Sequence, residues 1–64
     1  MKNNFMLIKS GETSYFFDKR EIQFVKYSDG VLFIKLKCFD EVDHIAISQD
    51  MANYIMNDLK EFEN

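Results

Sequence analysis

Seven consecutive residues, CFDEVDH from Cys38 to His44, hold the residue types of this chain that are best suited to chemistry. The only cysteine and the only histidine of the 64-residue chain lie there, together with three carboxylates. Thiolate, imidazole and carboxylate groups bind zinc and related metals, and a cysteine beside a histidine can act as a nucleophile. Both kinds of chemistry need the side chains to converge. Whether CFDEVDH can form such a site therefore depends on the strands and turns that carry it.

Five short segments rich in β-branched and aromatic residues precede one helical pattern, and no repeat or linker divides the chain. The sequence therefore predicts a single domain over residues 1–64 of class α+β. Its expected architecture is an antiparallel β-meander of four to five strands with one C-terminal α-helix packed on one sheet face. The expected strands are about 5–9, 13–17, 21–27, 31–38 and 42–47, and the expected helix is about 49–61. Ser10-Gly11 is the expected turn of the first hairpin.

The helix is predicted by its cap and by the spacing of its apolar residues. Ser48 is a favourable N-cap, and Asp50 in the first turn suits the positive end of the helix dipole. Apolar residues then recur at spacings of four, four and three, the period of one helix face. The face expected to enter the core comprises Met51, Ala52, Ile55, Met56, Leu59 and Phe62.

The turn between the third and fourth strands decides which of their residues face the core, because a shift of one residue turns every side chain to the other face. We favour a three-residue Ser28–Gly30 loop with Gly30 left-handed. This loop, together with a tight Asp40–Glu41 turn before the last strand, predicts a core face made of apolar residues. They are Ile22, Phe24, Leu32, Ile34, Leu36, Ile45 and Ile47. A two-residue Asp29–Gly30 turn would instead bring to that face Gln23, Val25 and Tyr27.

The favoured register separates the reactive residues of CFDEVDH. It places Cys38 opposite Asp43 on the core face and His44 opposite Lys37 on the outer face. The thiol and the imidazole then point away from each other, so we expect no metal site and no cofactor. Cys38 is expected to be a structural residue at the margin of the core. The chain has only two glycines and no glycine-rich phosphate loop, and we expect that it is not an enzyme.

The opposite sheet face is the main candidate for function. A solvated face normally carries mostly charged and small polar residues, whereas this one mixes aliphatic residues, two aromatics and two lysines. Its expected members are Gln23, Val25, Tyr27, Val31, Phe33, Lys35, Lys37, Val42, His44 and Ala46.

Three interpretations of this face remain open. The N-terminal hairpin could cover it through Phe5, Leu7, Tyr15 and Phe17. It could instead bind a second copy or another protein, since an exposed apolar patch with a polar rim marks a contact surface. Finally, it could bind a nucleotide or a single-stranded nucleic acid, with bases stacked on aromatic rings and phosphates held by lysines.

We favour the protein contact. The predicted partner or dimer interface comprises Val25, Tyr27, Val31, Phe33 and His44. Candidate anion contacts are Lys35 and Lys37. In the nucleic-acid alternative, the bases stack on Tyr27 and Phe33. A separate candidate contact is an acidic patch of Asp40, Glu41 and Asp43.

The net charge of −3 argues against non-specific binding to duplex nucleic acid, which depends on neutralising phosphates. One cysteine, no targeting segment and no membrane-length apolar run favour a cytoplasmic protein. The run DKREIQFVKYSDGVLFIKL, followed by a helical segment, resembles the strand pattern of small bacterial β-rich regulatory modules, including pleckstrin-homology-like domains. It carries no motif that assigns a role to any residue.

The sequence thus predicts a small non-catalytic interaction protein, homodimeric, that inhibits or adapts a larger partner. Phage or mobile-element proteins that block a host factor are of this size and charge. Nucleotide or single-stranded nucleic acid binding on the sheet face is the alternative.

Overall fold

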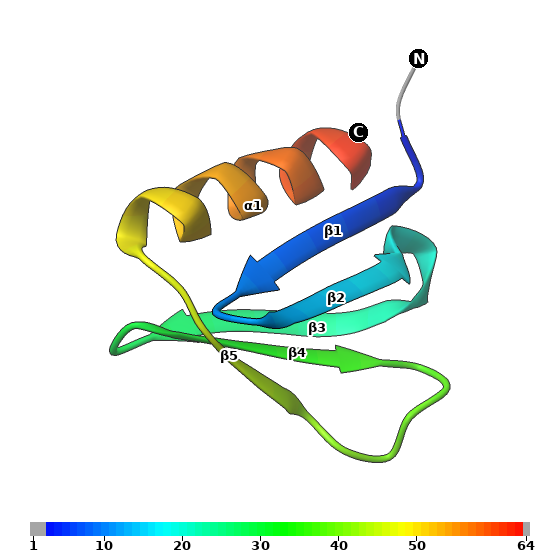
Figure 1. Ribbon diagram of the computed structural model, residues 1–64. Coiled ribbons are helices and arrows are strands. Elements are labelled where there is room, and N and C mark those ends of the chain that lie inside the picture. Colours follow the sequence, from blue (N-terminus) through cyan, green and yellow to red (C-terminus); the bar gives the residue numbers. More distant parts are fainter. Residues whose placement is uncertain (1–2, 64) are drawn as a thin grey trace.

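A computed structural model describes residues 3–63 of the chain. Two antiparallel sheets and one helix make up an α+β fold, as predicted, but the strands form separate sheets of two and three strands rather than one meander. The elements in chain order are β1 (Phe5–Ser10), β2 (Thr13–Asp18), the single 3-10 turn η1 (Lys19–Glu21), β3 (Ile22–Ser28), β4 (Val31–Leu36), β5 (Asp43–Ala46) and α1 (Gln49–Glu63) (Figure 1).

Both hairpins turn through two residues. Ser10 pairs with Thr13, so the first turn is Gly11-Glu12, one residue later than expected, and Gly11 has φ 61°. Ser28 pairs with Val31, and the two residues between them, Asp29 and Gly30, have φ 52° and 76°. Two successive positive φ angles are the requirement of a type I′ turn, whose twist matches that of the strands. The predicted three-residue loop is therefore wrong.

The two-residue turn changes the face of most β3 residues. Val25 pairs with Ile34 and Tyr27 pairs with Leu32, so both point toward the core, while Phe24 points outward. A β-bulge at Gln23 then restores the pairing of Ile22 with Leu36, so Ile22 also lies against the core. The expected positions of Phe24 on the core face and of Val25 and Tyr27 on the outer face rested on the three-residue loop and are wrong. Gln23, the extra residue of the bulge, is exposed and contacts the outward-facing Lys35, as its expected outer position requires.

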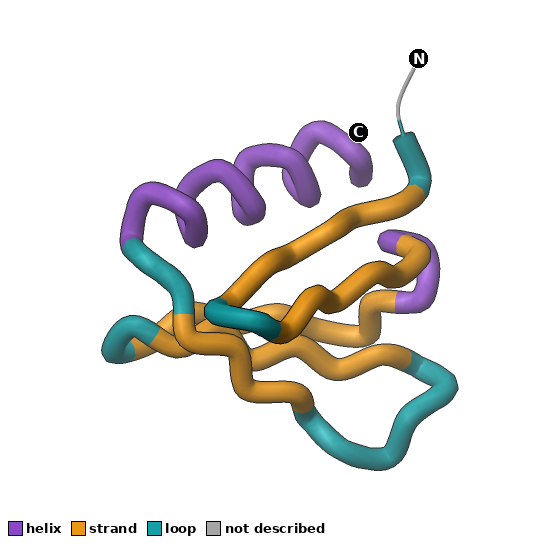
Figure 2. The backbone as a smooth tube through the Cα atoms, viewed as in Figure 1, coloured by secondary structure: helices purple, strands orange, loops and turns teal. Residues whose placement is uncertain are grey.

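The connection from β4 to β5 is a six-residue loop, residues 37–42, rather than the predicted tight Asp40–Glu41 turn (Figure 2). Ile45 pairs with Leu32, four residues away from the predicted Leu36. A shift by an even number keeps each β5 side chain on its face. Ile45 is accordingly buried and His44 points outward, opposite Phe33 rather than Lys37.

Helix α1 begins where the sequence predicts. The hydroxyl of Ser48 accepts a hydrogen bond from the backbone N–H of Met51 at 3.2 Å, which confirms the N-cap. Ala52, Ile55 and Leu59 are buried, as expected. Met51 is exposed, so its predicted place in the core is wrong.

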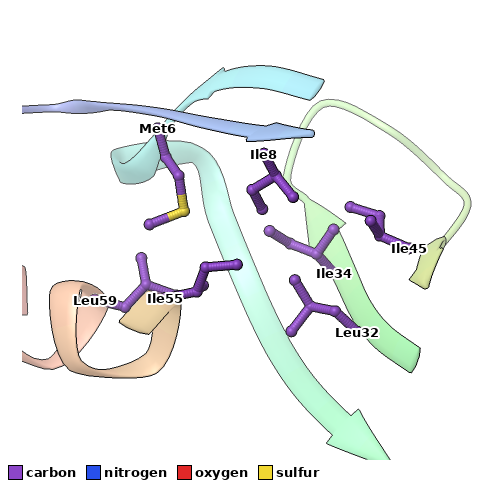
Figure 3. Packing of buried hydrophobic residues seen from close by; sticks show 7 residues of the cluster. All are labelled: Met6, Ile8, Leu32, Ile34, Ile45, Ile55 and Leu59. Carbon is purple, nitrogen blue, oxygen red and sulfur yellow. The ribbon is translucent and has the colours of Figure 1, made fainter. Parts of the chain in front are cut away.

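One core joins both sheets to the helix, and its side chains point toward one another (Figure 3). It comprises Met6, Ile8, Leu32, Ile34, Ile45, Ile55 and Leu59. Burying one leucine or isoleucine stabilises a fold by about 1.5–3 kcal/mol. The hairpin β1–β2 and helix α1 therefore lie on the same side of the three-stranded sheet (Figure 1), and no element within residues 3–63 covers its other side. The interpretation in which the hairpin covers the outer face is wrong.

Lys19 joins η1 to the helix. Its side chain is 4% exposed, and its Nζ lies 2.7 Å from Oδ2 of Asp58 and 5.4 Å from the centre of the Phe62 ring. A buried ammonium group is costly unless it is paired. The carboxylate of Asp58 therefore both satisfies Lys19 and holds the C-terminal half of α1 against η1.

Asp18 is the N-cap of η1, and its carboxylate binds both the backbone and the guanidinium of Arg20. Its Oδ1 accepts a hydrogen bond from the backbone N–H of Arg20 at 2.9 Å, and its Oδ2 lies 2.6 Å from Nη2 of the guanidinium. These hydrogen bonds, with that to the side chain the largest, lower the pKa of the Asp18 carboxyl below its usual 3.8. The same contact raises the pKa of Arg20.

Candidate binding surfaces

The uncovered face of the sheet β3–β4–β5 has an aromatic ring at its centre. Phe33 on β4 lies between Lys26 on β3 and His44 on β5, each its direct cross-strand neighbour. The Nζ of Lys26 is 4.7 Å from the centre of the Phe33 ring, and the His44 ring meets it edge-on at 4.8 Å between centroids. Cation–π and edge-to-face contacts of this kind hold an aromatic ring in one orientation.

We call this surface the cationic face. It consists of the outward residues Phe24, Lys26, Ser28, Val31, Phe33, Lys35, His44 and Ala46. It carries two lysines and a histidine, and none of these eight residues is a carboxylate, although the chain has a net charge of −3. Its apolar and positive groups together set it apart from the rest of an acidic molecule.

Lys35 has a structural task on this face. Its Nζ donates to Oε1 of Gln23 at 2.8 Å and to the backbone oxygen of Phe39 at 2.9 Å. It thus links the β3 bulge to the β4–β5 loop. Because the Lys35 ammonium already donates hydrogen bonds to these two oxygens, Lys26 is the better-placed cation for an incoming ligand.

The structure keeps three of the five predicted interface residues on this face. Val31, Phe33 and His44 lie on it, whereas Val25 and Tyr27 face the core. The Tyr27 hydroxyl donates to the backbone oxygen of Ile47 at 3.2 Å. Tyr27 therefore cannot stack a base on the outer face, and Lys37 lies beyond the end of β4. Sequence reasoning missed Phe24 and Lys26, although the Asp29-Gly30 dipeptide was a signal for the register that exposes them.

The CFDEVDH stretch is divided between a loop and a strand. Cys38 is exposed in the loop, so its predicted place at the margin of the core is wrong, and His44 lies on the cationic face. Within residues 3–63, no group of three or more histidine, cysteine or acidic residues is placed to hold a metal ion.

The acidic residues of this stretch do lie together. Asp40, Glu41 and Asp43 are exposed and line one shallow hollow with Phe39. The Lys35 bond to the backbone of Phe39 fixes the loop beside the cationic face. These residues lie together because neighbouring loop residues need no particular register to gather, and their role as a contact patch stays a prediction.

A second exposed surface lies on the hairpin, which sequence reasoning considered only as a possible cover for the outer face of the sheet. The rings of Phe5 and Phe16 stack on its outer side, 5.5 Å between centroids and 11° from parallel. Leu7 is the direct pair of Phe16 and, like Phe5, lines the hollow beside the helix. Phe16 is 68% exposed, so the stack is open to solvent.

A groove of about 340 Å³ continues this surface between β1 and α1. Phe5 and Leu7 line one wall, and Met51 and Tyr54 of the helix line the other. We call these five exposed residues the hairpin patch: Phe5, Leu7, Phe16, Met51 and Tyr54. The available signal was that the FMLI and YFF runs are apolar at successive positions, so that each strand must expose one apolar face.

A third hollow separates the C-terminal end of α1 from the start of β3. Ile22, Phe24 and Leu59 line it together with Lys19 and Arg20. Both cations already bind carboxylates, Asp58 and Asp18. The hollow therefore offers little charge to a ligand.

No helix within the described residues is long and apolar enough to cross a membrane. The resemblance in strand pattern to pleckstrin-homology-like modules stays a prediction. No protein-family model matches this chain, and comparisons with curated proteins and with solved structures find no match, so its function has to be inferred from the two surfaces themselves.

Proposed function

We propose that this protein is a non-catalytic interaction module whose cationic face binds an acidic segment of a larger partner protein. The observation that carries the proposal is the Lys26–Phe33–His44 cluster on an uncovered sheet face. A ring held by its neighbours offers apolar contact without a large loss of side-chain freedom, and the ammonium beside it offers charge. By binding such a segment the module would inhibit or adapt its partner, and we place this action in the cytoplasm.

A second copy of the chain suits the cationic face poorly. The sequence predicts a homodimer interface there, but face-to-face pairing would bring Lys26 and Lys35 toward the same residues of the other copy. Like charges across an interface are unfavourable, whereas opposite charges steer the partners together. A partner carrying Asp or Glu beside apolar side chains is complementary to this face.

A single-stranded nucleic acid or a nucleotide is the second candidate, and one observation favours it. Phe24 and Phe33 both lie on the outer face with Lys26 beside them, which is the combination that stacks bases and holds phosphates. Against it stand the net charge of −3 and the acidic loop that Lys35 holds beside the face. Anionic strands would be repelled by that loop.

Selection of displayed peptides on the immobilised protein tests the proposal. We expect enrichment of sequences with Asp or Glu next to apolar residues, and binding of a synthetic fluorescent peptide measured by anisotropy. The change Lys26→Glu should weaken that binding at least about tenfold, since it reverses the charge next to Phe33.

The matched control is Lys60→Glu, the same change on an exposed position of α1. It should leave peptide binding unaltered. Equal losses in both variants, or selected peptides without acidic residues, would contradict the proposal. Binding of a labelled 12-nucleotide oligothymidine that Lys26→Glu removes, without any acidic peptide, would support the second candidate instead.

A further inference from the structure

We infer that two copies of this protein pair through the hairpin patch. This surface is separate from the cationic face, and the inference does not depend on the proposed partner. The patch is continuous, because Phe16 stacks on Phe5 while Phe5, Leu7, Met51 and Tyr54 line one groove. None of its five side chains carries a charge.

The exposed area of the patch is close to what a stable interface needs. A whole aromatic side chain has an area of roughly 200 Å², and Phe16 and Tyr54 are 68% and 69% exposed. With the exposed parts of Phe5, Leu7 and Met51, the patch offers on the order of 500 Å² of apolar surface. A standard interface contributes about 800 Å² per partner, of which somewhat more than half is non-polar, and this again is about 500 Å².

The charges at the ends of the hairpin favour a two-fold arrangement. Phe5, Leu7 and Lys9 share the outer face of β1, and Ser14, Phe16 and Asp18 share that of β2. Lys9 is therefore near the turn, and Asp18 is at the opposite end, across from Phe5. If the two-fold axis lies in the plane of the interface and is perpendicular to the strands, the two hairpins pack face to face with their turns at opposite ends. Lys9 of each copy then lies near the end of its partner that carries Asp18, whose carboxylate also binds Arg20 of its own chain, and Leu7 and Phe16 lie near the axis.

The size of the chain gives an independent reason for pairing. A domain of about 60 residues buries only about 60% of the surface that its unfolded chain exposes, so it gains from covering more. The hairpin uses Met6 and Ile8 for the core, yet it presents three large apolar side chains to water on its other side. A self-complementary surface buries the same residues on both copies at once, as closed dimers do.

Light scattering and sedimentation equilibrium over a micromolar to millimolar range test the inference. The mass should rise toward twice the 7.7 kDa of one chain. Phe16→Lys should raise the dissociation constant at least about 30-fold, because a central aromatic residue is lost and two like charges are placed near the axis. Circular dichroism should show both forms equally folded, since Phe16 is exposed.

Phe24→Lys on the cationic face is the matched control, since it changes another exposed phenylalanine in the same way. It should leave the dimer intact. A dimer that Phe24→Lys dissociates and Phe16→Lys does not would overturn the inference, and so would a strict monomer at millimolar concentration. Either result leaves the peptide test of the cationic face unaffected.

Cross-linking tests the arrangement without relying on dissociation. In a Cys38→Ser background, which removes the exposed native thiol, Leu7→Cys should give dimers with a short bismaleimide. Phe24→Cys in the same background should not. The reverse pattern would place the interface on the wrong side of the molecule and contradict the inference.

Discussion

The two exposed surfaces stand on opposite sides of one core and differ mainly in their charge. On the hairpin patch, Phe5 and Phe16 stack on each other, and none of the five side chains of the patch carries a charge. On the cationic face, Phe33 contacts a lysine and a histidine. Both surfaces expose aromatic rings, so apolar area alone does not distinguish them. What differs is that a neutral surface can pair with a copy of itself, whereas a surface of one sign needs a partner of the other sign.

The comparison also concerns what holds each surface in place. The cationic face is a three-stranded sheet joined by backbone hydrogen bonds between neighbouring strands. The hairpin patch crosses from β1 to α1, two elements that share no ladder. The Lys19–Asp58 ion pair, which joins η1 to α1, lines the same groove. The hairpin patch should therefore be the more easily disturbed of the two.

Removing the counter-ion of Lys19 should have the largest effect. Asp58→Ala leaves the ammonium of Lys19 buried without its carboxylate, which we expect to lower the free energy of unfolding by about 2 kcal/mol. This is below the figure for a fully buried pair, since the Asp58 side chain is 35% exposed and water can reach the site. Urea unfolding followed by circular dichroism measures the loss.

The matched variant is Lys19→Met, which removes the buried charge and keeps an apolar stem next to Phe62. It should be close to neutral, because Asp58 can then turn to solvent. At equal folded fraction, Asp58→Ala should weaken self-association and leave peptide binding to the cationic face intact. Equal destabilisation by both changes would show that the packing of the Lys19 stem matters, and not the charge.

Salt should separate the two surfaces without any mutation. Raising NaCl from 50 mM to 500 mM should slow acidic-peptide association on the cationic face several-fold, because the Debye length falls below the reach of Lys26 and Lys35. Dimerisation through the neutral hairpin patch should be unchanged or slightly stronger. Stopped-flow fluorescence and sedimentation in the same buffers measure the two effects. A dimer that dissociates in salt would indicate that charge, and not apolar area, holds it.

Sequence reasoning predicted those parts of the molecule that depend on local pattern. The strands, the helix and its Ser48 cap follow from spacing and composition, and the structure confirms them. Which side chains of β3 face the core could not be predicted in this way, because it depends on one turn residue and one bulge. We expected a positive φ only at Gly30, but Asp29 also has a positive φ, of 52°. The extra residue Gln23 in the bulge then brings the Ile22 side chain back to the core face.

The same distinction between local pattern and strand register explains which candidate surfaces could be predicted from the sequence. The acidic residues of the β4–β5 loop lie together because they are neighbours in the chain, and no register is needed to predict that. The Lys26–Phe33 contact was missed because it joins two strands and depends on their register. The groove between β1 and α1 depends on how the helix sits across the hairpin. Helical spacing placed Met51 in the core and could not reveal that this edge of α1 is left exposed.

The smallest expected effect is the pH dependence of the corner between the two sheets. The folded state lowers the pKa of Asp18 through Arg20, so ionised Asp18 stabilises the fold. That stabilisation is complete at pH values above 3.8, the usual pKa of an aspartate, and is lost as the pH falls through the lower pKa that Asp18 has in the folded state. Asp18→Asn keeps an acceptor for the backbone N–H of Arg20 and removes the charge together with the second acceptor oxygen that binds the guanidinium. Wild type should therefore be slightly more stable than the variant at pH 7, and the two should converge at pH values well below 3.8, as measured by thermal unfolding. A difference that persists in acid would mean that the shape of the carboxylate matters more than its charge. Because Asp18 lies at the end of the hairpin that faces Lys9 of a second copy, the same variant should also weaken the dimer slightly, and only above that pH.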